Sequence, residues 1–154
     1  MQLAELNVGY ALYPLDDPRM VGFMDNLDKI NAVAERSDGY IWRMKSDSGN
    51  ATDLDVPGEE HMIANMSVWR DVESLGNYVF NTIYARFYEK RPAWFEHMTR
   101  HHFVMWWVED GHIPTLDEAM ERLAHLQEHG SNDHAFGWDA VDMSAFRQCE
   151  FAAE

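Results

Sequence analysis

Residues 61–69, HMIANMSVW, decide the fold because they alternate between two kinds of side chain. In an extended strand, successive side chains point to opposite faces. One face therefore carries only apolar groups, whereas the other carries two polar groups beside an indole. The apolar face comprises Met62, Ala64, Met66 and Val68, and the mixed face comprises Ile63, Asn65, Ser67 and Trp69. We predict a strand here, whose mixed face suits a pocket with a few orienting hydrogen bonds.

The chain before this strand is predicted to form a strand, a helix, a strand and a loop. Residues 3–12 have the alternation of a first strand. Asp17 precedes a proline, which is typical of a helix start, and apolar residues then recur at helical spacing over 18–36. Residues 40–45 are predicted to be the second strand. Residues 46–60 are polar and rich in glycine, so we expect a loop, and its glycines would let it close over a pocket.

The chain after this strand contains two more helical stretches and two more strand-like stretches. Asp71 is predicted to cap a helix over 72–91, which Pro92 would kink or restart as a second segment over 92–101. Residues 102–110 are apolar on both faces, so this strand is expected at the centre of the sheet.

A capping box opens the last predicted helix. Thr115 and Glu118 have the spacing of this motif, and Gly130 would end the helix. Residues 135–141 then suit a last strand.

The order of these elements predicts an α+β fold. It matches the ferredoxin-like arrangement, an antiparallel sheet with helices on one face. The opposite face then needs a cover, and a second copy of the chain would supply it. We therefore expect a homodimer whose sheets pack face to face as a dimeric α+β barrel. The domain would span residues 1–141, with a C-terminal tail over 142–154.

Composition excludes several classes of function. The 154 residues suggest one domain, and 12 basic against 27 acidic residues give a net charge of −15. Such a surface repels phosphate backbones and anionic lipids, so we expect no nucleic-acid and no membrane partner. The N-terminus lacks the pattern of a secretory signal and Cys149 is the single cysteine, so a cytoplasmic protein is expected. Aromatic residues make up 13% of the chain, which suits a core or an apolar ligand cavity.

Five stretches together resemble a known family. They are LNVGYALYPLDDPRMVGFMDNLDKINAVAERSDGYIWR, GNATDL, NMSVWRDVESL, PAWFE and VMWWVEDGHIPTLDEAMERL. They are similar to a bacterial family of proteins with a domain of unknown function, over roughly residues 3–138. That family is grouped with the dimeric α+β-barrel proteins, the superfamily of the antibiotic-biosynthesis monooxygenases. The resemblance implies a pocket between sheet and helices, and a superfamily of cofactor-free monooxygenases, cyclases, isomerases and haem proteins.

The sequence departs from the family pattern at one position. The family has a histidine in the middle of the second long helix, followed by a basic run, and here the histidine is replaced by Tyr84. The basic run is replaced by Tyr88-Glu89-Lys90-Arg91. Because related barrels use such a histidine as a haem ligand or acid–base, the substitution disfavours a haem bound through this helix.

The candidate site residues follow from this pocket. Tyr84 is a candidate phenol donor to a carbonyl or enolate oxygen, Asn65 and Ser67 would polarise the same group, and His101 would move a proton. The predicted substrate-binding residues are Asn7, Trp42, Trp69, Phe87, Trp94 and Trp107. Four of these residues also have a structural interpretation. Asn65 and Ser67 would anchor loops, Trp69 would belong to the core, and Tyr84 would be a buried tyrosine bonded to backbone.

Two histidines are spaced one helical turn apart. His97 and His101 have the separation that lets imidazoles share a metal, yet no third ligand is evident and no metal is expected. A cationic histidine at the end of a helix is stabilised by the helix dipole without any functional role, and this interpretation is preferred to a metal or a general base.

The leading functional hypothesis is a cofactor-independent enzyme of secondary metabolism. Its substrate would be small and apolar, polycyclic or polyketide-like, and the reaction a cyclisation, isomerisation or oxygenation. One alternative is a haem enzyme or haem carrier with His101 or His97 as axial ligand. Another is a non-catalytic dimer that binds a small molecule. Phosphate-loop, dinucleotide and HExxH motifs are absent from the sequence.

Overall fold

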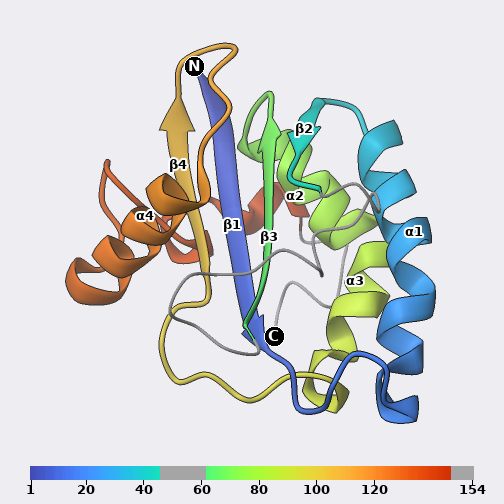
Figure 1. Cartoon of the computed structure of the whole chain (residues 1–154). Coiled ribbons are helices and arrows are strands. Elements are labelled where there is room, and N and C mark those ends of the chain that lie inside the picture. The colour runs from blue at the N-terminus through green and yellow to red at the C-terminus, as the bar shows by residue number, and fades with distance from the viewer. Residues whose placement is uncertain (46–61, 147–154) are drawn as a thin grey trace.

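Four antiparallel strands form one sheet in the order β2-β3-β1-β4 in the computed structural model, which describes residues 1–45 and 62–146 (Figure 1). The chain is therefore α+β, as predicted. The strands are β1 (Gln2–Tyr10), β2 (Tyr40–Arg43), β3 (Met62–Trp69) and β4 (Phe103–Val108). The helices are α1 (Val21–Arg36), α2 (Val72–Asn81), α3 (Ile83–Glu89) and α4 (Leu116–His129). The predicted loop over 46–60 and the end of the predicted tail, 147–154, lie outside the described residues.

Side-chain caps fix three helix starts where the sequence predicted them. The Asp17 carboxylate accepts from the backbone N–H of Arg19 at 2.9 Å, and a 3₁₀ turn over Pro18–Met20 leads into α1. Asp71 accepts from the Ser74 N–H at 2.8 Å at the start of α2. Thr115 caps α4, which ends at a glycine with a positive φ of 75°. These side chains satisfy N–H groups that helix ends leave without partners.

Thr82 divides the predicted helix over 72–91 into α2 and α3. Its backbone is extended, its hydroxyl donates to the Tyr78 carbonyl at 2.6 Å, and the same oxygen accepts from the Tyr84 N–H at 3.2 Å. One side chain thus ends the first helix and caps the second, so the break precedes Pro92.

The predicted helical segment over 92–101 is wrong. Pro92 sits in a 3₁₀ turn, Arg91–Ala93, and the chain beyond it runs alongside the end of β1. The N–H of Leu12 donates to the Trp94 carbonyl at 2.8 Å, and the N–H of Glu96 donates to the Tyr10 carbonyl at 2.9 Å. These bonds satisfy the backbone without a helix.

Strand β4 lies at an edge of the sheet, which corrects its predicted central position. Its residues are apolar on both faces because both faces are covered within the chain. Helix α4 packs on one face, and the ring of Phe103 stacks on Trp138 on the other, with centroids 5.4 Å apart. The predicted strand over 135–141 is a single bridge, in which Met105 and Phe136 exchange backbone hydrogen bonds of 2.8 and 2.9 Å.

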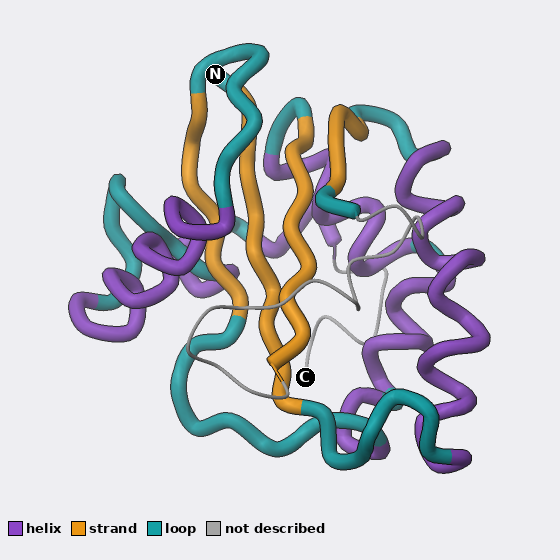
Figure 2. The backbone as a smooth tube through the Cα atoms, viewed as in Figure 1, coloured by secondary structure: helices purple, strands orange, loops and turns teal. Residues whose placement is uncertain are grey.

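Helices cover both faces of the sheet, whereas the sequence predicted helices on one face only. Helices α1, α2 and α3 lie on one side and α4 lies on the other (Figure 2). Helix α4 contributes Ala119, Leu123 and Leu126 to a cluster with the alternate residues Leu6 and Met66 of the strands. The chain itself thus covers part of the face that was expected to need a second copy, and the homodimer stays a prediction. No helix in the described ranges has the length and apolarity needed to cross a bilayer.

Candidate functional site

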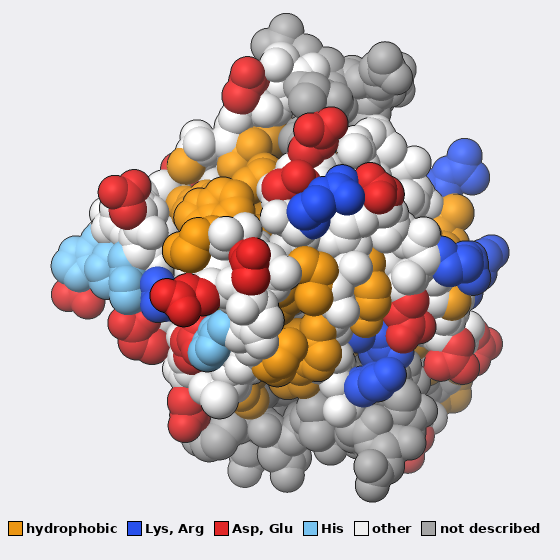
Figure 3. Space-filling model, turned by 90° about the horizontal axis from the view of Figure 1, so that it is seen from above, with side chains coloured by type: hydrophobic (Ala, Val, Ile, Leu, Met, Phe, Trp, Pro, Cys, Tyr) orange, Lys and Arg blue, Asp and Glu red, His pale blue; other side chains and the backbone are white. Residues whose placement is uncertain are grey.

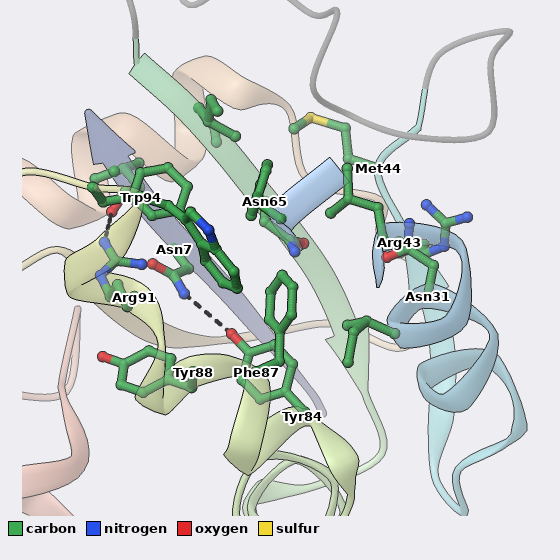
Figure 4. A pocket seen from close by; sticks show the side chains of 18 residues that line it. Asn7, Asn31, Arg43, Met44, Asn65, Tyr84, Phe87, Tyr88, Arg91 and Trp94 are labelled. Atoms are coloured by element: carbon green, nitrogen blue, oxygen red, sulfur yellow. Dashed lines mark hydrogen bonds between the residues drawn. The ribbon is translucent and has the colours of Figure 1, made fainter. Parts of the chain in front are cut away.

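A cavity lies between the sheet and the helices α1 and α3, at the end of the sheet where β1 meets the 91–95 segment (Figure 4). Its outer part has a volume of about 80 Å³. A smaller inner part of about 30 Å³ continues along the sheet toward Trp69. Both parts are lined by Asn7, Asn31, Arg43, Asn65 and Tyr84.

Polar side chains from three strands form the floor of this cavity. Strand register sets Glu5 opposite Ser67 and Asn7 opposite Asn65 across the β1–β3 pair. On the other side of β3, Arg43 pairs with Ser67. Because residues two apart share a face, these five side chains lie on the side that carries α1 and α3.

Glu5 is the most buried charged residue of this floor, with 6% of its surface exposed. The Ser67 hydroxyl donates to Glu5 Oε1 at 2.6 Å, and the Trp69 indole N–H donates to Ser67 Oγ at 2.8 Å. An indole only donates, so Ser67 Oγ accepts from Trp69 while its own proton is directed to Oε1. With Oε1 accepting this hydrogen bond, Oε2 is the oxygen of Glu5 that can carry the carboxyl proton.

Burial raises the pKa of Glu5 from 4.5 to about 8, although the hydrogen bond from Ser67 acts in the opposite direction. The charged form is disfavoured because water no longer solvates it. At pH 7 the group is therefore mainly a neutral acid, with roughly a tenth of molecules ionised. A carboxyl with its pKa close to neutrality can both accept and release a proton under ordinary conditions.

Asn7 and Tyr84 form a second polar pair beside Glu5. Asn7 Nδ2 donates to the Tyr84 hydroxyl at 3.4 Å (Figure 4). Asn7 Oδ1 is buried and has no hydrogen-bond partner among the described residues. Burial, and then the nearby Glu5, raise the pKa of Tyr84 well above its usual value, so the phenol keeps its proton and remains a donor. A buried acceptor without a partner is costly, and a ligand with an O–H or N–H group would satisfy it.

Aromatic rings line the outer part of the cavity. Phe23 lies 5.7 Å from Phe87 and 5.1 Å from Phe95 between ring centroids, and Phe87 lies 5.1 Å from Trp94. Leu27 and Ile63 complete the apolar lining. The cavity is thus apolar outside and polar at its floor, which suits a ligand with an apolar body and a polar end.

Arg91 joins the apolar wall to β1. Its Nη2 donates to the Val8 carbonyl at 2.7 Å, and its guanidinium lies 5.1 Å from the centroid of the Phe95 ring. Gly9 permits this approach, because a Cβ there would lie 2.9 Å from the Phe95 ring and 3.0 Å from Arg91 Nη2. Any side chain at this position would push both groups out of the cavity wall.

The structure brings most of the predicted site residues together. Seven line one or both parts of the cavity: Asn7, Asn65, Ser67, Trp69, Tyr84, Phe87 and Trp94. The roles assigned to them remain predictions, but their shared location follows from the strand alternation and from the short helix α3.

Three predicted residues lie elsewhere. A register shift between Tyr40 and Trp42 moves the Trp42 side chain to the face that carries α4. Trp107 is 38% exposed and packs near Phe136, at the opposite end of the sheet from the cavity. His101 is exposed in the loop before β4, where its carbonyl accepts from Gln127. His97 is exposed in the same loop, and the described residues hold no cluster of three metal-binding side chains.

Three charged residues of the cavity were not among the predicted site residues, namely Glu5, Arg43 and Arg91. The sequence did point to Glu5, because it stands two residues before Asn7 in a mainly apolar strand. Residues two apart in a strand lie on the same face, so Glu5 and Asn7 must share one. It did not point to Arg43 or Arg91, since charged residues at the end of a strand or next to a proline are ordinary surface features.

Comparison with known proteins supplies a family and a distant structural likeness. The family described as Domain of unknown function (DUF3291) matches residues 2–150. The crystal structure of NE2512, a protein of unknown function from Nitrosomonas europaea, is similar with a TM-score of 0.48 and 11% sequence identity. That likeness covers 74% of this chain and 95% of the other. A search of curated proteins gave no match.

Proposed function

The chain belongs to the family described as Domain of unknown function (DUF3291), and we propose from its own cavity that it is an enzyme that moves a proton within a small molecule. Glu5 would be the catalytic acid–base, and Tyr84 with Asn7 would hold the substrate oxygen. The observation that carries this proposal is a buried carboxyl in the cavity floor, held by Ser67 through Oε1. It replaces His101, which lies outside the cavity, in the role of proton carrier.

The reaction class that fits these groups is isomerisation by way of an enolate. The Glu5 carboxylate would take a proton from the carbon beside a carbonyl group, and the C–H electron pair would form the enolate. The phenol of Tyr84 would donate to the developing oxyanion, because its proton is retained at all ordinary pH values. Where the substrate has a C=C bond next to that carbon, the enolate is conjugated with it. Return of the proton from Glu5 to the far end of this bond moves the double bond beside the carbonyl group and completes an isomerisation that consumes no further reactant.

The cavity sets the size of the substrate. An outer volume of about 80 Å³ has room for roughly six water molecules, which corresponds to a compound of about ten non-hydrogen atoms. The ring wall of Phe23, Phe87 and Trp94 favours a flat apolar body. A small monocyclic carbonyl compound therefore fits the enclosed space better than the polycyclic substrate expected from the sequence.

Some wider features remain part of this proposal. The strand order supports a ferredoxin-like arrangement and a place among the dimeric α+β-barrel proteins. A homodimer and a cytoplasmic location are proposed with it. A haem alternative is less supported, because no histidine of the described residues lines the cavity.

The test is exchange of carbon-bound hydrogen for deuterium. Phenylacetone in D₂O, followed by NMR, is expected to exchange its benzylic hydrogens faster with the protein than without it. Glu5→Gln should reduce that acceleration by about 100-fold or more, because it removes the base and keeps the shape. The control Glu73→Gln makes the same change at an exposed position of α2 and should leave the rate unchanged.

A second measurement separates an enzyme from a non-catalytic binder. Chemical-shift changes in the cavity residues on addition of phenylacetone, with no exchange above the uncatalysed rate, would favour the binding protein. Equal exchange by the wild type and Glu5→Gln would contradict Glu5 as the acid–base.

A further inference from the structure

We propose that the substrate of this cavity is a small organic anion, whose carboxylate is bound by Arg91 while its apolar body lies against the rings of Phe87 and Trp94. This inference rests on the proposed function, since it names the class of molecule on which Glu5 would act. It concerns a different group of the cavity, so it can fail while the role of Glu5 stands.

The first support is a local reversal of charge. The whole chain has a net charge of −15, and acidic side chains are spread over the face seen in Figure 3. The outer cavity, in contrast, is lined by Arg43 and Arg91, and its described lining residues include no aspartate or glutamate. A positive cavity in a strongly acidic protein attracts a negative ligand and holds it in a region of low dielectric.

The second support is the difference between these two arginines. Arg43 Nε lies 3.6 Å from a carboxylate oxygen of Glu35, so its charge has a partner. For Arg91, no carboxylate among residues 1–45 and 62–146 comes within the 4 Å of an ion pair. Arg91 is half-buried, and its guanidinium donates to the neutral carbonyl of Val8. In the described part of the chain it therefore lacks the negative partner that normally compensates a buried charge.

The third support is the geometry around Arg91. Its guanidinium lies near two rings, 5.7 Å from the centroid of Tyr88 and 5.1 Å from that of Phe95, while Nη2 is fixed on the Val8 carbonyl. The missing side chain of Gly9 leaves the space that this guanidinium occupies, because a Cβ there would lie 3.0 Å from Arg91 Nη2. An arginine fixed in this way presents its remaining N–H groups as a fork, which binds a carboxylate through two parallel hydrogen bonds.

The rest of the cavity tolerates an anion. Glu5 would repel a carboxylate if it were ionised, but burial raises its pKa to about 8, so it is mostly neutral at pH 7. The cavity can therefore hold one negative charge near Arg91 and a neutral acid at its floor. A small oxo acid with an apolar body would place its carboxylate and its carbonyl at these two ends.

The test compares two probes that differ only in charge. Phenylacetate and phenylacetamide have the same shape, and both are sized for the cavity. Their dissociation constants from the full-length protein are measured by NMR titration at pH 7 and low salt. We expect phenylacetate to bind at least tenfold more tightly than the amide. In Arg91→Gln this preference should disappear, whereas Arg86→Gln, an equal change at an exposed position of α3, should keep it.

Arg91→Lys provides a second variant in case Arg91→Gln does not fold. Lysine keeps the charge but loses the fork, so phenylacetate should bind several-fold more weakly than to the wild type and still more tightly than the amide. Equal affinity of the two probes, a preference that survives Arg91→Gln, or binding of neither probe would each overturn the proposal. Failure of the acid–base role is read separately, from hydrogen exchange in Glu5→Gln.

Discussion

The two faces of the sheet are made from alternate residues of the same strands, yet one is a closed core and the other is the floor of a cavity. On β1, Leu6 and Val8 face α4 and are at most 1% exposed. Their neighbours Glu5 and Asn7 face α1 and α3, and Asn7 Oδ1 is a buried acceptor that has no partner in the described part of the chain. The face toward α4 is buried along the whole of β3, whereas on the cavity face Ile63 is half-buried and Asn65 is exposed. Glu5 and Ser67 of the cavity face are nevertheless buried, so their polarity is not explained by exposure to solvent.

This difference shows which groups of the sheet lower the free energy of unfolding. A buried carboxyl and an unpaired amide oxygen each cost free energy that an aliphatic side chain would not. The face toward α4 shows that these strands accept aliphatic residues readily. Polar groups concentrated on the opposite face at a cavity thus indicate a site rather than a requirement of the fold.

The largest expected effect is a pH dependence of stability that belongs to the cavity face alone. The folded protein holds the Glu5 proton up to a pKa of about 8, whereas the unfolded chain releases it near 4.5. As pH rises through this window, the unfolded state binds fewer protons, so the free energy of unfolding falls by up to about 5 kcal/mol. Urea unfolding of the wild type and Glu5→Gln at pH 5 and pH 9 should show this loss in the wild type only.

The difference between the wild type and Glu5→Gln isolates the contribution of Glu5 to the pH dependence of stability. Burial lowers the pKa of His102 to about 4, so its contribution to stability is lost as pH falls from 6.5 through 4. Both proteins share this change, and it cancels in their difference. A wild type whose stability relative to Glu5→Gln is the same at both pH values would show that Glu5 titrates normally.

The next effect compares neighbouring residues on opposite faces. Leu6→Ala should lower the free energy of unfolding by about 3 kcal/mol, because it leaves a void in the closed core. Asn7→Ala should change it by less than about 1 kcal/mol, since it removes one long hydrogen bond together with an unsatisfied oxygen. Equal losses in the two variants, measured by urea unfolding, would mean that the cavity face is packed as a core.

Ser67→Ala is expected to have a smaller effect on stability and a distinct effect on Glu5. It leaves the Trp69 indole N–H without its acceptor, at a cost of about 1–2 kcal/mol. It also removes the hydrogen bond that lowers the pKa of Glu5, so that pKa should rise further. NMR titration of the Glu5 carboxyl carbon measures the shift, and Ser67→Thr, which retains a hydroxyl, serves as the control.

Tyr84→Phe should have the smallest effect on stability. Among residues 1–45 and 62–146 the hydroxyl takes part in one hydrogen bond, of 3.4 Å, so its loss should cost less than about 1 kcal/mol. The acceleration of hydrogen exchange should fall by roughly tenfold or more, because the donor to the oxyanion is gone. Thermal unfolding and phenylacetone exchange measured on one preparation would separate the two effects. An unchanged exchange rate would remove Tyr84 from the site.

Much of the fold was predictable because local signals decided it. The caps at Asp17, Asp71 and Thr115 lie where the sequence indicated, and the alternation of β3 placed Asn65 and Ser67 on one face. Those signals depend on neighbours in the chain. Register then added what the sequence did not provide, namely which residue of β1 lies opposite each of them.

The errors arose where contacts between distant segments decide the outcome. Trp42 was predicted to line the pocket, but a register shift in the β2–β3 pair places its side chain on the face that carries α4. Strand β4 looks central because it is apolar on both sides, although the ring of Trp138, far along the chain, covers Phe103 on one of them. His101 was placed on a helix that the backbone hydrogen bonds of the 91–96 segment replace.

The break at Thr82 gives one wall of the cavity a helix start of its own, separate from α2. Residues 82–95 carry Tyr84, Phe87, Arg91 and Trp94, and they begin at a cap that depends on the hydroxyl of Thr82. We therefore expect substitutions within this stretch to change the ligand preference of the cavity while the strands with Glu5 and Ser67 stay as they are. We expect a chimaera that takes residues 82–95 from a relative and keeps the sheet of this protein to bind the ligands of that relative while it retains Glu5.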